Sequence, residues 1–186
     1  DNDFASCLTI EELKHVWEPG SEVNAWSEVR GGFPEERLRL YGADTDSGTF
    51  DYFTEEIVGE AQSSRADYTA SADDNVLVRG IASDPSALGY FGYAYYLENA
   101  DQVNSVEIDS GDGCVAPTPE NIESGAYSPL SRPLFIYVNK ARVEKPEVRA
   151  FLEFYMAEAK RLTTEVGYVP ADDATYTGNL SRAGIN

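Results

Sequence analysis

The pattern of apolar and polar positions in the first third of the chain switches between a helical and a strand period. Apolar residues recur at helical spacing from Thr9 to Trp17, and Thr9 with Glu12 three positions later predicts a capping box. Arginine and leucine alternate over residues 37–40, with Arg37 and Arg39 on one side and Leu38 and Leu40 on the other, which predicts a short strand over 37–41. Between positions 50 and 58 the helical spacing returns, so a second helix is expected there.

Strand-like runs stand out in the rest of the chain. The run 87–97 is the most strand-like, and its Gly89 and Gly92 are typical of positions that a neighbouring backbone or a ligand approaches closely. A further strand is expected over residues 104–109. The segment 128–138 passes from a proline-punctuated extended stretch into an apolar run that also predicts a strand.

Helices are expected between these strands. A cluster of capping residues at 73–75 precedes an apolar run, and Thr118 followed by Pro119 marks the start of a short helix. From Pro146 a longer helix carries one apolar stripe, whereas the polar tail 169–186 has little periodicity. The alternation of helices with short strands predicts an α/β fold.

The turn Ser47, Gly48, Thr49 lies where the predicted strand passes into the predicted helix. The first N–H groups of a helix have no partner inside it and carry a partial positive charge, so they can bind an anion. Glycine lets the backbone come close to such a ligand, and the two hydroxyl groups add donors. Simple capping of the helix by Ser47 explains the same residues, so both interpretations stay open here.

Arg65 is the one basic residue between Arg39 and Arg79, and it stands among hydroxyl groups and acids. One interpretation is a surface ion pair with Asp67, which contributes little to stability. The other is a bidentate grip on an oxyanion, which the planar guanidinium suits.

The charge of the chain limits its partners. Its 186 residues include 33 acidic and 14 basic ones, a formal net charge of -19. A field of this sign repels nucleic acid and anionic membranes, and no apolar run reaches the length of a membrane span. The same field repels a phosphate-like ligand at long range, so an anion site must work through short-range hydrogen bonds.

The cysteine and histidine content argues against a metal site and against nucleophilic catalysis. Cys7 and Cys114 lie far apart without CxxC spacing, so they are either a disulfide in an exported protein or two buried thiols in a cytosolic one. The single histidine, His15, is on a predicted helix far from Ser47, which disfavours both a zinc site and a Ser-His-Asp triad. No cofactor is predicted.

The chain resembles the PstS family, the periplasmic phosphate-binding proteins of ABC importers, in its TDSGTFDYF branch. Six segments match in the family's order, and they are LTIEEL (8–13), SGT (47–49), DDNVLV (73–78), ALGYFGYAYY (87–96), APTPENI (116–122) and SPLSRPLFIYV (128–138). The resemblance implies a periplasmic-binding-protein-like (type II) α/β lobe, with a mixed central sheet flanked by helices. It also implies that an oxyanion binds between two such lobes.

The same resemblance implies how the chain is divided. Residues 1–127 correspond to the second lobe, and residues 128–186 to a crossover strand and a C-terminal helix and tail that return toward the first lobe. The N-terminal part of the first lobe is expected upstream of Asp1. The chain is therefore expected to be a fragment with about half of the binding site and to bind phosphate weakly by itself.

The family's site residues carry over in part. Ser47 and Thr49 would supply hydroxyl and backbone N–H donors, and Gly48 a backbone N–H. Many members have an arginine four residues before the serine, where this chain has Ala43, so Arg65 is the candidate for the missing guanidinium.

The resemblance also implies a location and partners. Export to the periplasm or the cell exterior is expected, with a Cys7–Cys114 disulfide and with the membrane subunits of an ABC transporter as partners. Binding of phosphate without catalysis is the leading hypothesis. The alternatives are a binding protein for sulfate or molybdate and a phosphate-ester hydrolase, which the lack of a metal-ligand cluster and of a base beside Ser47 disfavours.

Overall fold

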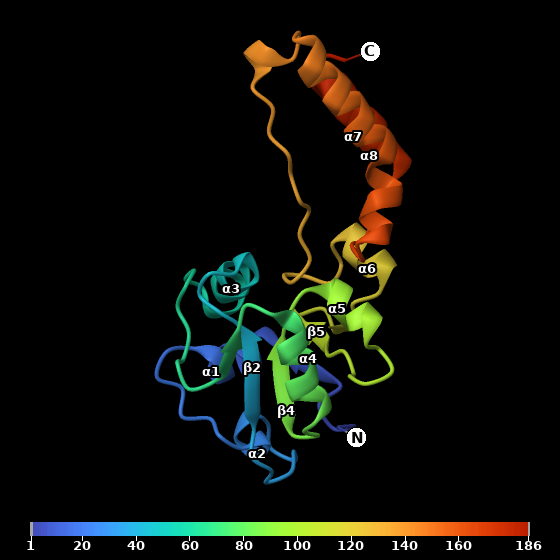
Figure 1. Ribbon diagram of the computed structural model, residues 1–186. Helices are drawn as coiled ribbons and strands as arrows, with labels where there is room; N and C mark the ends of the chain where they lie inside the picture. Colours follow the sequence, from blue (N-terminus) through green and yellow to red (C-terminus); the bar gives the residue numbers. More distant parts are fainter. Residues whose placement is uncertain (1, 186) are drawn as a thin grey trace. The chain divides into compact units, whose positions relative to one another are not determined.

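The computed structural model describes residues 2–185 of the protein (Figure 1). The chain divides between Ser131 and Arg132 into two compact units, called unit 1 and unit 2 in chain order. The division falls a few residues after Tyr127, the predicted end of the second lobe.

Unit 1 contains a parallel sheet with strand order β3-β2-β4. Its strands are β2 (Arg39–Ala43), β3 (Thr69–Ser71) and β4 (Ala87–Tyr90). Each strand is followed along the chain by a helix, namely α3 (Gly48–Phe53), α4 (Asp74–Ala82) and α5 (Tyr93–Glu98). Because the strands are parallel, all three helices begin at the same edge of the sheet, and α3 lies at the end of β2 opposite α2 (Figure 1).

A second, mixed sheet in unit 1 has the strand order β1-β5-β6. Strand β1 (Cys7–Thr9) is parallel to β5 (Glu107–Asp109), and β6 (Cys114–Val115) is antiparallel to β5. The remaining helices of unit 1 are α1 (Ile10–Trp17), α2 (Trp26–Val29) and α6 (Pro119–Ser124). A parallel sheet and a mixed sheet, together with these helices, confirm the α/β, periplasmic-binding-protein-like class expected from the sequence.

Local signals place most helix starts correctly. The capping box of α1 is present, with the Glu12 N–H donating to Thr9 Oγ1 at 3.1 Å and the Thr9 N–H donating to Glu12 Oε2 at 2.9 Å. Thr118 caps α6, and Gly125 ends that helix with φ at 77°. These contacts involve residues at most a few positions apart, which is why the sequence alone predicts them.

The core of unit 1 is aromatic. Trp17 and Trp26 are fully buried, as are Leu8 and Val16. The indole N–H of Trp26 donates to the Ser86 carbonyl at 3.0 Å, which ties α2 to the start of β4. Both tryptophans therefore serve packing.

Unit 2 is a helical hairpin built on α7 (Pro146–Glu165) and α8 (Asp173–Arg182), preceded by a short 3₁₀ turn, η2 (Lys140–Arg142). Its small core contains Val143, Leu152 and Ile185. Helix α7 agrees with the sequence prediction. Helix α8 corrects the expectation of an irregular tail, because Asp172 caps it and Leu180 packs against the small core.

Two strand predictions are wrong in the structure. The run 87–97 forms β4 only as far as Tyr90, since Gly92 becomes the N-cap of α5 and its carbonyl accepts from the Tyr95 N–H at 3.0 Å. The segment 128–138 has no strand assigned, and its Tyr137 side chain is 91% exposed. A strand needs a partner, and the described residues offer none to this segment.

No helix in residues 2–185 combines the length and the apolar character needed to cross a membrane.

Candidate functional site

The turn 47–49 lies directly beyond the carboxyl end of β2, the central strand of the parallel sheet. Ser47 is the N-cap of α3, and its Oγ accepts the Thr49 N–H at 3.1 Å. The preceding loop is also ordered by short contacts, because the Asp44 carbonyl accepts the Ser47 N–H at 3.1 Å. The capping role of Ser47 is therefore real, and its hydroxyl still carries a proton that can be donated.

Helix α3 is held in place by its buried side and by an unusual end. Phe50 and Phe53 are buried, and α3 runs directly into a π-helical segment, η1 (Thr54–Val58). Buried Thr54 donates its hydroxyl proton to the Phe50 carbonyl at 2.8 Å and accepts the Gln62 N–H at 2.8 Å. The far end of α3 is thus anchored, which fixes the direction of the N–H groups at its start.

Two neighbouring helices begin at the same edge of the sheet. Asp73 caps α4 by accepting the Asn75 N–H at 3.0 Å, and Gly92 is the N-cap of α5. Burial raises the pKa of the Asp74 carboxyl, while a hydrogen bond from the Gly92 backbone opposes this rise. Open α/β sheets bind ligands beyond the carboxyl ends of their strands, where these helices start. Sequence analysis missed this convergence because strand order is not visible in a single sequence.

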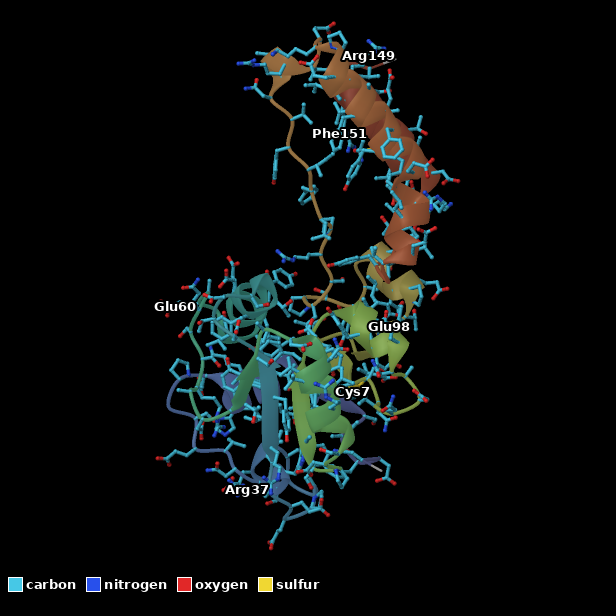
Figure 2. The ribbon with its side chains drawn as sticks, in the orientation of Figure 1. Cys7, Arg37, Glu60, Glu98, Arg149 and Phe151 are labelled. Carbon is cyan, nitrogen blue, oxygen red and sulfur yellow. A yellow bond between two sulfur atoms is a disulfide. The ribbon has the colours of Figure 1, made fainter. Side chains whose placement is uncertain are left out.

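The other end of the sheet is remote from this edge. Arg37 lies at the end of unit 1 opposite α3 (Figure 2). Arg39, at the start of β2, pairs through Nε with the Asp84 carboxylate at 2.6 Å. Neither arginine is thus near the turn.

Arg65 lies in the loop between η1 and β3, and its side chain is only 4% exposed. Its Nε and Nη2 donate to the two carboxylate oxygens of Asp67 at 2.6 and 2.8 Å. Its Nη1 donates to the carbonyls of Val16 and Val23 at 3.1 and 2.8 Å. The hydrogen bond from Arg65 holds the pKa of the Asp67 carboxyl below its usual range. These contacts favour a structural role for Arg65, and its geometry gives no support to an anion grip.

The position of the family's arginine is filled by Ala43, the last residue of β2, which is fully buried. Its carbonyl accepts the hydroxyl of Tyr68 at 3.0 Å. The turn therefore presents hydroxyl and backbone N–H donors without a basic side chain at that position.

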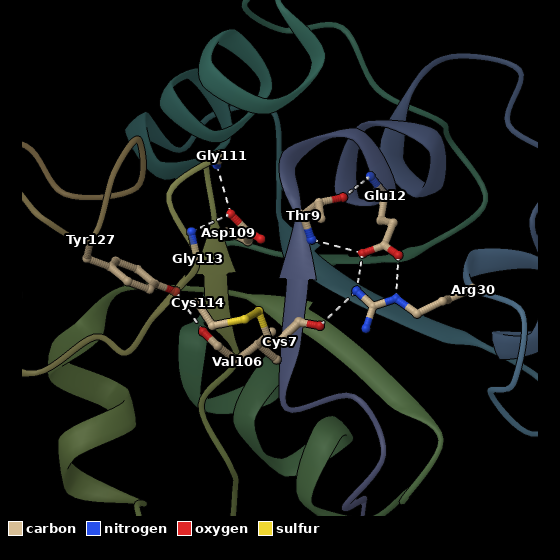
Figure 3. The surroundings of a disulfide bond; sticks show 10 residues. All are labelled: Cys7, Thr9, Glu12, Arg30, Val106, Asp109, Gly111, Gly113, Cys114 and Tyr127. Atoms are coloured by element: carbon tan, nitrogen blue, oxygen red, sulfur yellow. Dashed lines mark hydrogen bonds and ion pairs between the residues drawn. A yellow bond between two sulfur atoms is a disulfide. The ribbon is translucent and has the colours of Figure 1, made fainter.

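A disulfide joins Cys7 of β1 to Cys114 of β6, with the two Cα atoms 6.0 Å apart (Figure 3). Beside it, Asp109 shapes the hairpin between β5 and β6 by accepting the N–H groups of Gly111 and Gly113 at 2.8 and 3.0 Å. The disulfide confirms the pairing that the resemblance implied. Among residues 2–185 the two cysteines also form, with Glu107, the one close group of three potential metal ligands, but both sulfurs are used in the disulfide.

The fold and the site together define a class of protein, an α/β domain with helix N-termini gathered at the carboxyl edge of a parallel sheet, the edge where open α/β sheets bind ligands. The chain belongs to the PBP superfamily, because the family model of the PBP superfamily domain matches residues 1–159.

Individual relatives agree with this assignment. SphX of Synechocystis sp. is 46% identical over 188 aligned residues, which cover all of this chain and 55% of SphX. The phosphate-binding protein PstS of Staphylococcus haemolyticus is 31% identical, over 97% of this chain and 56% of PstS. The chain thus spans about half the length of the curated relatives it matches.

Solved structures show the same fold. A possible phosphate binding protein from Planctomyces limnophilus has a TM-score of 0.88 and 49% identity, over 98% of this chain and 66% of that protein. PstS from Borrelia burgdorferi has a TM-score of 0.68 at 20% identity, over 90% of this chain and 64% of that protein, which is a likeness of fold alone.

Proposed function

We propose that this chain is part of an exported binding protein that captures inorganic phosphate for an ABC importer. The observation that carries the proposal is the turn 47–49, which starts an anchored helix at the carboxyl edge of a parallel sheet. The names of the relatives support phosphate as the ligand, because PstS of Staphylococcus haemolyticus is a phosphate-binding protein.

In this proposal the turn 47–49 holds the phosphate by hydrogen bonds alone. Ser47 and Thr49 contribute hydroxyl donors, and Gly48 contributes its N–H. The N–H groups of Ser47 and Thr49 already donate to the Asp44 carbonyl and to Ser47 Oγ. Arg65 is left out, because its guanidinium already binds Asp67 and two backbone carbonyls. The protein binds phosphate and does not transform it.

Export and transport belong to the same proposal. A disulfide persists in oxidising compartments, so the Cys7–Cys114 bond supports a periplasmic or extracellular location. The membrane subunits of an ABC transporter are the proposed partners that receive the phosphate.

The test is a phosphate titration followed by NMR of the ¹⁵N-labelled chain, with Ser47→Ala as the main variant. Thr118→Ala is the matched control, because Thr118 caps α6 in the same way and accepts the Asn121 N–H. Phosphate is expected to shift the Gly48 and Thr49 amide signals saturably. Ser47→Ala should weaken binding by about tenfold, the effect of losing one hydrogen bond to an anion.

The Thr118→Ala control is expected to lose stability but not phosphate affinity. Equal losses of affinity in the two variants would contradict the proposed site, and wild-type signals that do not respond to phosphate would overturn the function. Tighter binding of sulfate than of phosphate would favour a different oxyanion. Turnover of a chromogenic phosphate ester that depends on Ser47 would favour the hydrolase.

We further propose that residues 128–186 pack against a first lobe. The part of the relatives that this chain does not match, about half of their length, would form that lobe. Unit 2 leaves several large apolar side chains exposed to water, at a cost in free energy, namely Leu134, Phe135, Tyr137, Phe151 and Phe154. The Phe151 ring, 58% exposed, stands on the open side of α7 (Figure 2). Exposed apolar patches of this kind mark interaction surfaces.

This division predicts that the 186-residue chain binds the hydrophobic dye ANS through unit 2 and binds phosphate more weakly than micromolar. A protein of the relatives' full length should bind less ANS and more phosphate. Equal dye binding by the two proteins, or micromolar affinity of the chain alone in calorimetry, would contradict the division.

A further inference from the structure

Two tyrosine hydroxyls converge on one backbone carbonyl at the start of the phosphate-binding turn. The carbonyl belongs to Ala43, the last residue of β2, and the distances are 3.0 Å to Tyr68 Oη and 3.5 Å to Tyr90 Oη. From Ala43 the chain needs only three residues, 44–46, to reach Ser47. A shift of this carbonyl would therefore move the donors of the turn.

The tyrosine rings are held by the same aromatic cluster that holds α3. Tyr90 stacks on Phe53 of α3, with ring centroids 3.8 Å apart and planes 5° apart. Trp17 packs edge-on against Tyr68 and Tyr90, with centroid distances of 5.4 and 4.9 Å. The cluster thus contacts the chain on both sides of the turn. Tyr68 contacts Ala43 before the turn, and Tyr90 contacts Phe53 after it.

Gly42 shows how closely the Tyr90 ring lies against the strand. A Cβ atom at Gly42 would stand 2.6 Å from Tyr90 Cε1, so a larger residue would displace the ring. Burial raises the pKa of Tyr90 and of Tyr68, so both hydroxyls stay protonated and able to donate. The Tyr90 ring is therefore fixed against β2, and its hydroxyl lies beside both the Ala43 carbonyl and the Tyr68 hydroxyl, with which it shares a hydrogen bond.

We infer that Tyr68 and Tyr90 are positioning residues for phosphate, which act by holding the Ala43 carbonyl so that the Gly48 N–H and the hydroxyl groups of Ser47 and Thr49 are placed to donate to the anion. The inference rests on the proposed function. It goes beyond that function by assigning a role to two tyrosines whose hydroxyl groups lie at the Ala43 carbonyl and not at the turn 47–49 itself.

A purely structural role makes a different prediction, and the chain supplies the control. Tyr127 Oη donates to the Val106 carbonyl at 3.0 Å, the same contact as that of Tyr68, but in the other sheet region of unit 1. If the tyrosine hydroxyls only satisfy buried carbonyls, Tyr68→Phe and Tyr127→Phe should both lower the stability of the fold, and the two variants should bind phosphate with the same affinity.

The experiment compares the wild-type chain with Tyr68→Phe, Tyr68→Phe/Tyr90→Phe and Tyr127→Phe. Inorganic phosphate is titrated at constant ionic strength while the Gly48 and Thr49 amide signals are followed by NMR. Tyr68→Phe is expected to weaken binding about fivefold and the double variant more, whereas Tyr127→Phe stays within about twofold of wild type. Urea unfolding of each variant measures stability separately.

Hydrogen exchange without phosphate gives a second readout. The amides of residues 47–49 should exchange faster in Tyr68→Phe than in Tyr127→Phe at equal global stability. Equal affinities and equal exchange in these two variants would overturn the inference. If wild type itself does not respond to phosphate, the proposed function fails, and the exchange rates alone then decide whether the tyrosines hold the turn.

Discussion

At the scale of single residues, Arg65 is a buried cation that supplies hydrogen-bond donors to the C-terminal carbonyl groups of helix α1. The last carbonyl groups of α1 have no helical partner, and the loop 64–65 supplies donors for them. The Trp17 carbonyl accepts the Arg65 N–H at 3.0 Å and the Ser64 hydroxyl at 3.1 Å, while the Val16 carbonyl accepts the guanidinium. A positive charge at a helix C-terminus is also favoured by the helix dipole.

Arg65→Ala is therefore expected to destabilise the protein by about 2 to 4 kcal/mol, because buried carbonyls lose their partner. Arg39→Ala is the control, since its pair with Asp84 is half exposed and should contribute less than about 1 kcal/mol. Urea unfolding measures both variants. Equal losses would argue against the helix-end role, and a loss of phosphate binding at unchanged stability would restore Arg65 as an anion ligand.

Asp67 links this contact to pH. Its folded-state pKa is lowered by the hydrogen bond from Arg65, so its contribution is present above the unfolded-state pKa of about 3.9 and is lost as the pH falls through the lower folded value. Unfolding free energies at neutral and acid pH should show a smaller acid loss in Asp67→Asn than in wild type. Identical pH profiles would mean that the pair contributes nothing measurable.

At the scale of elements, the disulfide links two strands that are far apart in the chain. Cys7 and Cys114 are separated by 107 positions, and they join the two strands that flank β5. These strands are only three and two residues long, so their hydrogen bonds alone hold the sheet weakly. The cross-link compensates for short strands.

Removal of the disulfide in Cys7→Ser/Cys114→Ser is expected to cost about 2 to 5 kcal/mol of unfolding free energy. The wild type treated with a reductant under denaturing conditions and refolded should show the same loss. Chemical unfolding with and without reductant measures the effect. If the double variant unfolds at the wild-type urea concentration, the short strands hold the sheet without help.

At the scale of the whole molecule, the charge is concentrated in one unit. Unit 1 has 26 of the 33 acidic residues but only six of the 14 basic ones, whereas unit 2 is nearly neutral. The proposed anion site therefore lies in a strongly negative field. Short hydrogen bonds must overcome repulsion that acts over a longer distance.

Salt should for this reason strengthen phosphate binding. The Debye length falls from about 30 Å at 0.01 M salt to about 3 Å at 1 M, which screens the repulsion but not the hydrogen bonds within the site. Association rates and affinities for phosphate are expected to rise with sodium chloride, with an equal osmolarity of sucrose as the control. Binding that weakens steadily with salt would indicate a cationic site and contradict the hydrogen-bonded turn.

The sequence by itself determined the features that depend on neighbouring residues. The capping box of α1 and the N-caps Ser47 and Thr118 all follow from residues within one helical turn. The turn 47–49 was visible for the same reason. The disulfide came instead from the resemblance to the PstS family, because spacing alone left its pairing open.

The tertiary structure decided what depends on residues far apart. The order β3-β2-β4 brings three helix starts to one edge, and it ends β4 at Tyr90 where the aromatic run suggested a longer strand. Arg65 found its partners at Val16 and Val23, more than forty positions away. Periodicity reports the preference of a short segment for helix or strand. Strand pairing and buried hydrogen bonds depend instead on how segments from the whole chain pack together.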